Sequence, residues 1–264
     1  MKKLIIFIFK KLGFKDIEKD GIITTIRDTF LTKAGRENGP VRELWIENTL
    51  KKIPAGKKVL DAGAGELKYK TFCNHLDYTS QDFGGYDGRG TGEGIQMGNW
   101  DNSRLDIISD IIKIPVPDKS FDAILCVEVF EHISEPALAV REFARIVKPG
   151  GKVIITTPFC SLTHFAPFYF ANGYSKYWYE KVLTENGFVI EEIFFNGNFF
   201  KYLAQEIKNI KIMASRYSKV STKWWILFRL SEIIMLQALS KLSKKDTGSS
   251  ELLCFGLHIV ATKK

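Results

Sequence analysis

The stretch "KKVLDAGAGELKYK" at residues 57–70 decides the fold. It opens with an apolar run typical of a buried strand and then breaks into two closely spaced glycines, Gly63 and Gly65. Glycines in a strand–turn–helix unit let a ligand approach the backbone, and the N-terminus of the helix offers free N–H groups. The turn is therefore a candidate for holding a dinucleotide phosphate, a nucleoside without phosphate, or no ligand at all.

Beyond this turn, short apolar runs alternate with amphipathic stretches, which predicts an α/β domain with a parallel sheet. Strands are expected near 57–62, 78–82, 105–109, 121–128, 151–157, 188–195 and 252–262, and helices near 41–52, 66–75, 136–147 and 174–186. Residues 84–98 carry seven of the 21 glycines, so we expect a mobile connection or lid there rather than a helix.

The composition indicates a protein with a substantial core and no disulfide framework. Of the 264 residues, 45% are hydrophobic and 13% are aromatic. The four cysteines form no CxxC pair, which argues against a zinc site and fits a reducing cytoplasm. No set of metal ligands is predicted.

Most of the positive charge lies in one segment near the C-terminus. Residues 201–250 hold 10 basic and 3 acidic side chains, a difference of +7 in a chain whose net charge is +8. The stretch 223–242 is apolar almost all round, but Arg229 and Glu232 near its middle argue against a transmembrane span. Because basic residues flank an apolar helix, we expect a buried or interfacial helix that favours anionic lipid over nucleic acid.

The N-terminal run "MKKLIIFIFKKLG" is too short for the core of a signal peptide or for a membrane span. It predicts a short amphipathic helix that lies on a membrane or packs on the domain.

Acidic side chains follow three further predicted strands, at the edge where open α/β sheets bind their ligands. Asp82 ends the second strand, where a carboxylate accepts both ribose hydroxyls of an adenosine, and Asp110 ends the third, within reach of an adenine amino group. Glu128 follows the fourth strand. The third glycine of a G-x-G-x-x-G motif is Lys68 here, which counts against a pyrophosphate ligand and makes a dehydrogenase the weakest enzymatic interpretation.

Four segments together resemble the successive motifs of class I S-adenosylmethionine-dependent methyltransferases, most of all the small-molecule group called type 11. They are "VLDAGAGE", "QDF", "SDIIKIPVPDKSFDAILCVEVFEHI" and "EFARIVKPGGKVIITTPF". The resemblance covers about residues 41–196 and the last strand. It implies a Rossmann-like methyltransferase fold with a seven-stranded, mostly parallel sheet whose last strand is antiparallel, and S-adenosylmethionine as the cofactor.

The resemblance also implies a division of the chain into four parts. They are an N-terminal amphipathic extension (1–40), a cofactor-binding methyltransferase core (41–197), a basic and apolar helical insertion (198–249) and the final strand of the core (250–264).

Eight positions take cofactor-binding roles by this resemblance. They are Asp61, Gly63 and Gly65 in the turn around the methionine moiety, Asp82 at the ribose, Asp110 and the Ile111 backbone at the adenine, and Glu128 and Val129 near the sulfonium. Each residue alone has a structural alternative, as a strand end, a helix cap or a turn former. Four of them taken together, in the right order and each at the carboxyl end of a strand, favour the binding role: Gly63, Gly65, Asp82 and Asp110.

Two histidines are candidates for the base that an oxygen nucleophile needs in methyl transfer. His132 follows the fourth predicted strand, and His164 lies in an aromatic-rich loop after the fifth. A structural hydrogen bond at a helix start is the competing interpretation of His132.

The stretch "HFAPFYFANGYSKYWYEKVLTENGF" resembles methyltransferases encoded with surface-polysaccharide pathways. The resulting hypothesis is O-methylation of a small molecule, a sugar or a lipid-linked glycan by a cytoplasmic enzyme, peripheral at the inner membrane face through 198–249 and the N-terminus. A lipid or quinone head group is the alternative acceptor. A non-catalytic module of the same fold that docks a membrane or a partner is the alternative of another class, and the oligomeric state is left open.

Overall fold

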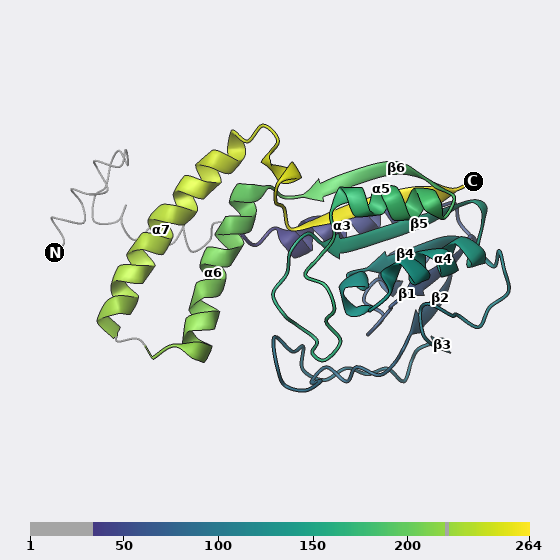
Figure 1. Ribbon diagram of the computed structural model, residues 1–264, viewed down its shortest axis with the longest axis horizontal. Coiled ribbons are helices and arrows are strands. Elements are labelled where there is room, and N and C mark those ends of the chain that lie inside the picture. The colour runs from purple at the N-terminus through teal and green to yellow at the C-terminus, as the bar shows by residue number, and fades with distance from the viewer. Residues whose placement is uncertain (1–33, 220–221) are drawn as a thin grey trace. The chain divides into compact units, whose positions relative to one another are not determined.

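The computed structural model describes residues 34–219 and 222–264 (Figure 1). The described chain divides into two compact units, one formed by Asn38–Asn198 with Gly248–Lys264 and the other by residues of the range Phe199–Thr247 with residues 34–37. The amphipathic helix predicted at the N-terminus falls on residues 1–33, outside the described part of the chain.

The first unit is built on a seven-stranded sheet with the order β3-β2-β1-β4-β5-β7-β6. The strands are β1 (Lys58–Ala62), β2 (Asp77–Asp82), β3 (Ile107–Ile108), β4 (Phe121–Val127), β5 (Val147–Pro158), β6 (Phe188–Asn196) and β7 (Gly256–Lys263). The pairs from β3 to β5 are parallel, and β7 runs antiparallel to both β5 and β6. The predicted Rossmann-like methyltransferase fold with an antiparallel last strand is confirmed.

Helices cover both faces of this sheet because the central strands are apolar on both sides. On one face α4 (Pro136–Ile146) and α5 (Lys176–Glu185) pack on β4 side chains such as Ile124 (Figure 1). On the other face α3 (Asn38–Leu50) packs on the alternate β4 side chains, including Leu125.

The helix predicted at 66–75 is wrong. The chain after β1 makes only a short 3-10 helix, η1 (Lys70–Cys73). Leu67 has φ +63°, a left-handed conformation that an α-helix does not accommodate. The backbone instead closes successive three-residue turns, with Leu67 N–H donating to Ala64 and Lys70 N–H donating to Leu67. The glycine turn is therefore followed by a compact series of turns, and not by an α-helix, before β2 begins.

The second unit contains two helices that pack along each other, α6 (Phe199–Tyr217) and α7 (Thr222–Lys244) (Figure 1). Their contact is apolar and joins Ala204 and Ile207 of α6 to Leu236 of α7. Arg229 forms an ion pair with Glu232 on α7. Within the described residues, no helix is long and apolar enough to cross a bilayer.

Candidate active site

A pocket opens at the carboxyl ends of β1, β2 and β4, the edge at which open α/β sheets bind their ligands. Six of the eight predicted cofactor residues line it: Gly63, Asp82, Asp110, Ile111, Glu128 and Val129. Asp61 and Gly65 are not among its lining residues. The structure therefore brings most of the predicted positions to one cavity.

The glycine turn is held against the end of β2 by the Asp82 carboxylate. Gly65 N–H donates to Oδ2 over 3.0 Å, and Gly84 N–H donates to Oδ1 over 2.9 Å. Each oxygen keeps a further acceptor direction, so Asp82 can also bind a pair of hydroxyl donors. Gly63 has φ +80°, and a Cβ added to it would lie 2.4 Å from Cγ2 of Val129. The turn therefore requires glycine at this position.

Asp61 lies beneath the turn and is only 1% exposed. Its Oδ2 accepts a hydrogen bond of 2.7 Å from the Tyr78 hydroxyl. Burial raises the pKa of Asp61 from 3.8 to about 7, with a further rise from the Asp82 charge and a partial offset from the Tyr78 bond. The Asp61 side chain is thus held by Tyr78 of β2 inside the core.

Glu128 is fixed at the end of β4 in a strained backbone conformation, with φ +53°. Its Oε1 accepts a hydrogen bond of 2.8 Å from Thr156, and its Oε2 lies 2.7 Å from the Arg42 guanidinium. Arg42 comes from α3, and sequence reasoning missed it because nothing local links that helix to β4. The carboxylate is thereby anchored at the edge of the pocket with its orientation set from two sides.

Aromatic rings form one wall of the pocket; the sequence pointed to Phe165, in the aromatic-rich loop after the fifth strand, but not to Tyr86 or Trp100. Tyr86 stacks on Phe165 with ring centroids 4.5 Å apart, and Trp100 meets both rings edge-on at 5.1 and 5.3 Å. The glycine-rich segment 84–98 is bound to the loop after β5, because Ile95 N–H donates to Thr163 and Phe165 N–H donates to Ile95. The mobility predicted for this segment stays a prediction.

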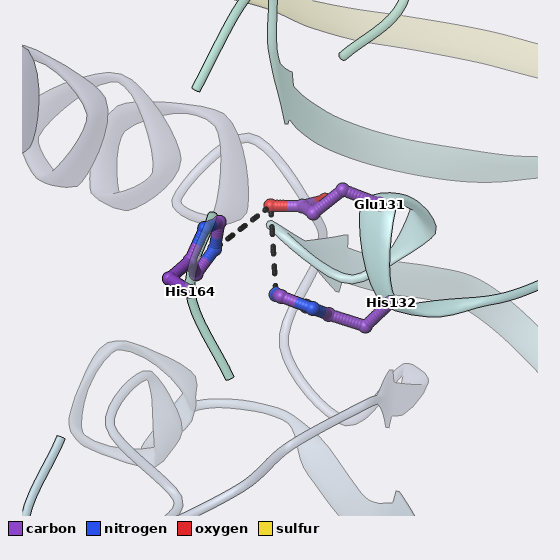
Figure 2. Close-up of side chains that lie close together, drawn as sticks. All are labelled: Glu131, His132 and His164. Atoms are coloured by element: carbon purple, nitrogen blue, oxygen red, sulfur yellow. Dashed lines mark ion pairs between the residues drawn. The ribbon is translucent and has the colours of Figure 1, made fainter. Parts of the chain in front are cut away.

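The two predicted histidines lie together, on either side of Glu131 (Figure 2). His132 lines the pocket, whereas His164 is not among its lining residues; the centroids of the two rings are 4.7 Å apart. Burial lowers the pKa of His132 to about 4, so its imidazole is neutral at physiological pH. Burial, followed by the Glu128 charge, raises the pKa of Glu131 well above its ordinary range. Glu131 was not predicted as a site residue, although the sequence shows it directly before His132.

Comparisons with known proteins agree with this geometry. A family model described as a methyltransferase domain matches residues 93–155. The ubiquinone biosynthesis O-methyltransferase of Stutzerimonas stutzeri is 29% identical over 123 residues, which are 46% of this chain and 52% of that protein. The protein of the same name from Ralstonia nicotianae is 30% identical over 128 residues, covering 46% of this chain and 50% of that protein. The matches thus span about half the length of these relatives.

The solved structures that align with the chain share little sequence with it. Phosphoethanolamine N-methyltransferase 2 of Haemonchus contortus, in complex with S-adenosyl-L-methionine, aligns with a TM-score of 0.47 at 15% identity, covering 84% of this chain and 52% of that one. A putative methyltransferase from Bacillus halodurans aligns with a TM-score of 0.42 at 16% identity, covering 81% and 94%. Neither alignment bears on the chemistry.

The family model and the relatives confirm the predicted resemblance to class I S-adenosylmethionine-dependent methyltransferases. The match to the methyltransferase-domain model lies within residues 93–155, and this part of the chain carries the likeness to the type 11 group.

Proposed function

We propose that the protein transfers a methyl group from S-adenosylmethionine to an oxygen of a small-molecule, sugar or lipid-linked acceptor. The observation that carries the proposal is the pocket at the carboxyl ends of β1, β2 and β4, where Asp82 and Asp110 offer acceptors beside the Gly63 turn. In the described part of the chain, the lining holds three carboxylates and no Lys or Arg, so it suits the hydroxyl and amino donors of a nucleoside better than a negatively charged phosphate.

The residues present fit the cofactor at three points. Asp82 would bind the ribose hydroxyls with its remaining acceptor directions, and Asp110 with the Ile111 backbone would bind the adenine. Glu128, held by Arg42, would receive the methionine end. Val129 packs so closely on Gly63 that a side chain at position 63 would collide with it, which keeps the backbone of the turn bare at the edge of the pocket.

S-adenosylmethionine supplies a methyl group already activated by the sulfonium, so the protein has to align the acceptor and exclude water. Tyr86, Trp100 and Phe165 form the apolar wall that would exclude water from the pocket. His132, one of the two predicted bases, lines the pocket, but burial lowers its pKa to about 4, which makes it a weak acceptor for the proton of a hydroxyl group.

The relatives favour one class of acceptor among those we considered. Both are named ubiquinone biosynthesis O-methyltransferases, which supports an oxygen on a quinone or lipid head group over a sugar. The two-helix unit supports the same choice, since Ile210, Ile212 and Met235 are exposed apolar residues in a basic segment. We propose that this unit contacts the membrane surface on which such an acceptor resides.

The acceptor class is tested by the formation of S-adenosylhomocysteine from S-adenosylmethionine with two sets of substrates. A phenolic head group on a polyprenyl tail should be methylated, and a polyprenyl-linked sugar should not. The Asp82→Asn variant serves as the control for turnover that depends on the pocket. Cofactor binding without turnover on either set would favour the non-catalytic module.

Membrane contact is tested by co-sedimentation with vesicles that contain anionic lipid. Ile212→Glu should release the protein, because it places a charge on an apolar position that is 57% exposed. Leu252→Glu is the matched control, since it makes the same change at a position that is 72% exposed in the other unit. Equal binding by wild type and Ile212→Glu would contradict the proposed contact.

A further inference from the structure

Three side chains converge beside the cofactor pocket with no function assigned to their combination. Glu131 and His132 belong to the short helix η2 (Phe130–His132) after β4, and His164 lies in the loop after β5 (Figure 2). Oε1 of Glu131 is 3.8 Å from Nε2 of His132 and 3.9 Å from Nε2 of His164. One ligand atom from each of the three residues lies within 4.8 Å of the other two.

Both imidazoles are oriented so that a lone pair faces this point. Nδ1 of His132 lies 2.6 Å from the Phe168 carbonyl oxygen, and Nδ1 of His164 lies 2.8 Å from that of Leu162. Because a carbonyl oxygen only accepts hydrogen bonds, Nδ1 carries the proton in both rings. Each Nε2 is therefore left with a lone pair directed toward Glu131.

One oxygen of the Glu131 carboxyl group has no hydrogen-bond donor among the described residues. Glu131 is 1% exposed, and this oxygen is Oε2. Buried carboxyl groups normally have partners, since an unsatisfied one costs free energy. A single proton would bind only one of the lone pairs that converge here from the two Nε2 atoms and the Glu131 carboxyl group. A metal cation would bind all of them.

We propose that Glu131, His132 and His164 bind one divalent transition-metal ion of the zinc type. Two imidazoles and one carboxylate are the three protein ligands of a zinc site that keeps an open coordination position. Imidazole favours zinc and its neighbours over magnesium or calcium, which take oxygen ligands. The carbonyls of Phe168 and Leu162 act as the outer partners that metal-bound histidines usually have.

The spacing of the ligand atoms is close to what such an ion needs. Metal–ligand bonds of about 2.0–2.1 Å in a tetrahedral site place the ligand atoms about 3.3 Å apart. The separations of 3.8 and 3.9 Å from Glu131 therefore have to close by about half an ångström, and the separation between the two histidine nitrogens, which is within 4.8 Å, has to close by up to about 1.5 Å. Because His164 lies on a loop, a shift of this size does not disturb the sheet.

The place of the site indicates what the ion does. His132 lines the cofactor pocket, so the open coordination position lies at the edge of the space in which the acceptor binds. A bound ion would hold the acceptor hydroxyl and favour the loss of its proton. This role rests on the proposed methyl transfer, whereas metal binding itself does not.

The test is metal binding by the full-length protein after treatment with a chelator and dialysis, in the absence of S-adenosylmethionine. Zn²⁺ is titrated by calorimetry, and Co²⁺ is titrated by its visible absorption, which reports ligand geometry. One equivalent should bind per chain. His164→Ala and Glu131→Gln should each weaken binding about 100-fold or more, since even a lost outer partner costs 10–100-fold.

His75→Gln is the matched control, because His75 contacts the Leu50 and Ile53 carbonyls far along the chain from the cluster. It removes one imidazole and should leave metal affinity unchanged. Circular dichroism confirms that each variant is folded, and binding of S-adenosylhomocysteine is measured separately.

No stoichiometric binding by folded wild type would overturn the metal site, as would wild-type affinity in both Glu131→Gln and His164→Ala. Loss of binding in those two variants, with S-adenosylhomocysteine binding retained, would support the site independently of the proposed reaction.

Discussion

Replacing Asp61 by Asn should change the pH dependence of stability in a defined direction. Burial raises the pKa of this carboxyl from 3.8 to about 7, so the folded state favours the protonated form. The protonated Asp61 contributes its full stabilisation to the folded protein below pH 3.8. This contribution is lost as the pH rises to about 7, because ionisation of Asp61 then lowers the free energy of the unfolded chain but not that of the folded protein. A rise of about three pH units at about 1.4 kcal/mol each corresponds to roughly 4 kcal/mol.

Asn is neutral at every pH and can still accept the hydrogen bond from Tyr78. Wild type and Asp61→Asn should therefore have similar free energies of unfolding at pH 4, and the variant should be more stable by up to about 4 kcal/mol at pH 8. Urea denaturation followed by tryptophan fluorescence across this range measures the difference. Asp77→Asn, which removes an exposed carboxylate at the start of β2, is the control and should show no such trend.

A difference between wild type and Asp61→Asn that stays constant from pH 4 to pH 8 would refute this reasoning. It would mean that water or a neighbouring group stabilises the ionised carboxylate inside the folded protein.

Three further substitutions test other parts of the structure. Gly63→Ala should lower the free energy of unfolding by about 2 kcal/mol and weaken S-adenosylhomocysteine binding, because φ at this position is +80° and the new Cβ would lie 2.4 Å from Val129. A thermal melt and a ligand titration that both match wild type would contradict the requirement for glycine. Asp110→Asn should weaken the same ligand about tenfold, as expected for the loss of one charged hydrogen bond, and leave the melting temperature unchanged; unaltered affinity would remove Asp110 from the adenine site. Lys152→Met should change the free energy of unfolding by less than about 1 kcal/mol, because the ion pair of Lys152 with Glu191 is 2.6 Å long but exposed. A larger decrease in the free energy of unfolding, measured by urea denaturation, would show that this ion pair is coupled to the sheet.

Central strands such as β4 were predictable because a strand that is buried on both faces of a parallel sheet is a nearly continuous apolar run, as in "AILCV" of β4. The pocket followed from the same pattern, since the carboxyl ends of parallel strands meet at one edge and bring Asp82 and Asp110 together. The coil after β1 was not predictable, because the left-handed conformation of Leu67 depends on how the turn is bound to β2.

The aromatic wall of the pocket and the proposed metal site depend on contacts between segments that are distant in the sequence. Tyr86 and Phe165 are almost 80 residues apart, and nothing in the local pattern of either segment identifies the other as its partner. His132 and His164 were each predicted as candidates, but their common contact with Glu131 arises only when the loop after β5 folds back. Long-range loop docking is the part of this site that local periodicity cannot specify.

The central claim, a nucleoside-type cofactor site, is tested most directly by calorimetric titration of the full-length protein with S-adenosylhomocysteine, with NADH as the comparison ligand. We expect micromolar binding of S-adenosylhomocysteine by wild type, none of NADH, and a large loss of affinity in Asp82→Asn. Binding of NADH in preference to S-adenosylhomocysteine, or no binding of either ligand by the folded protein, would contradict the account.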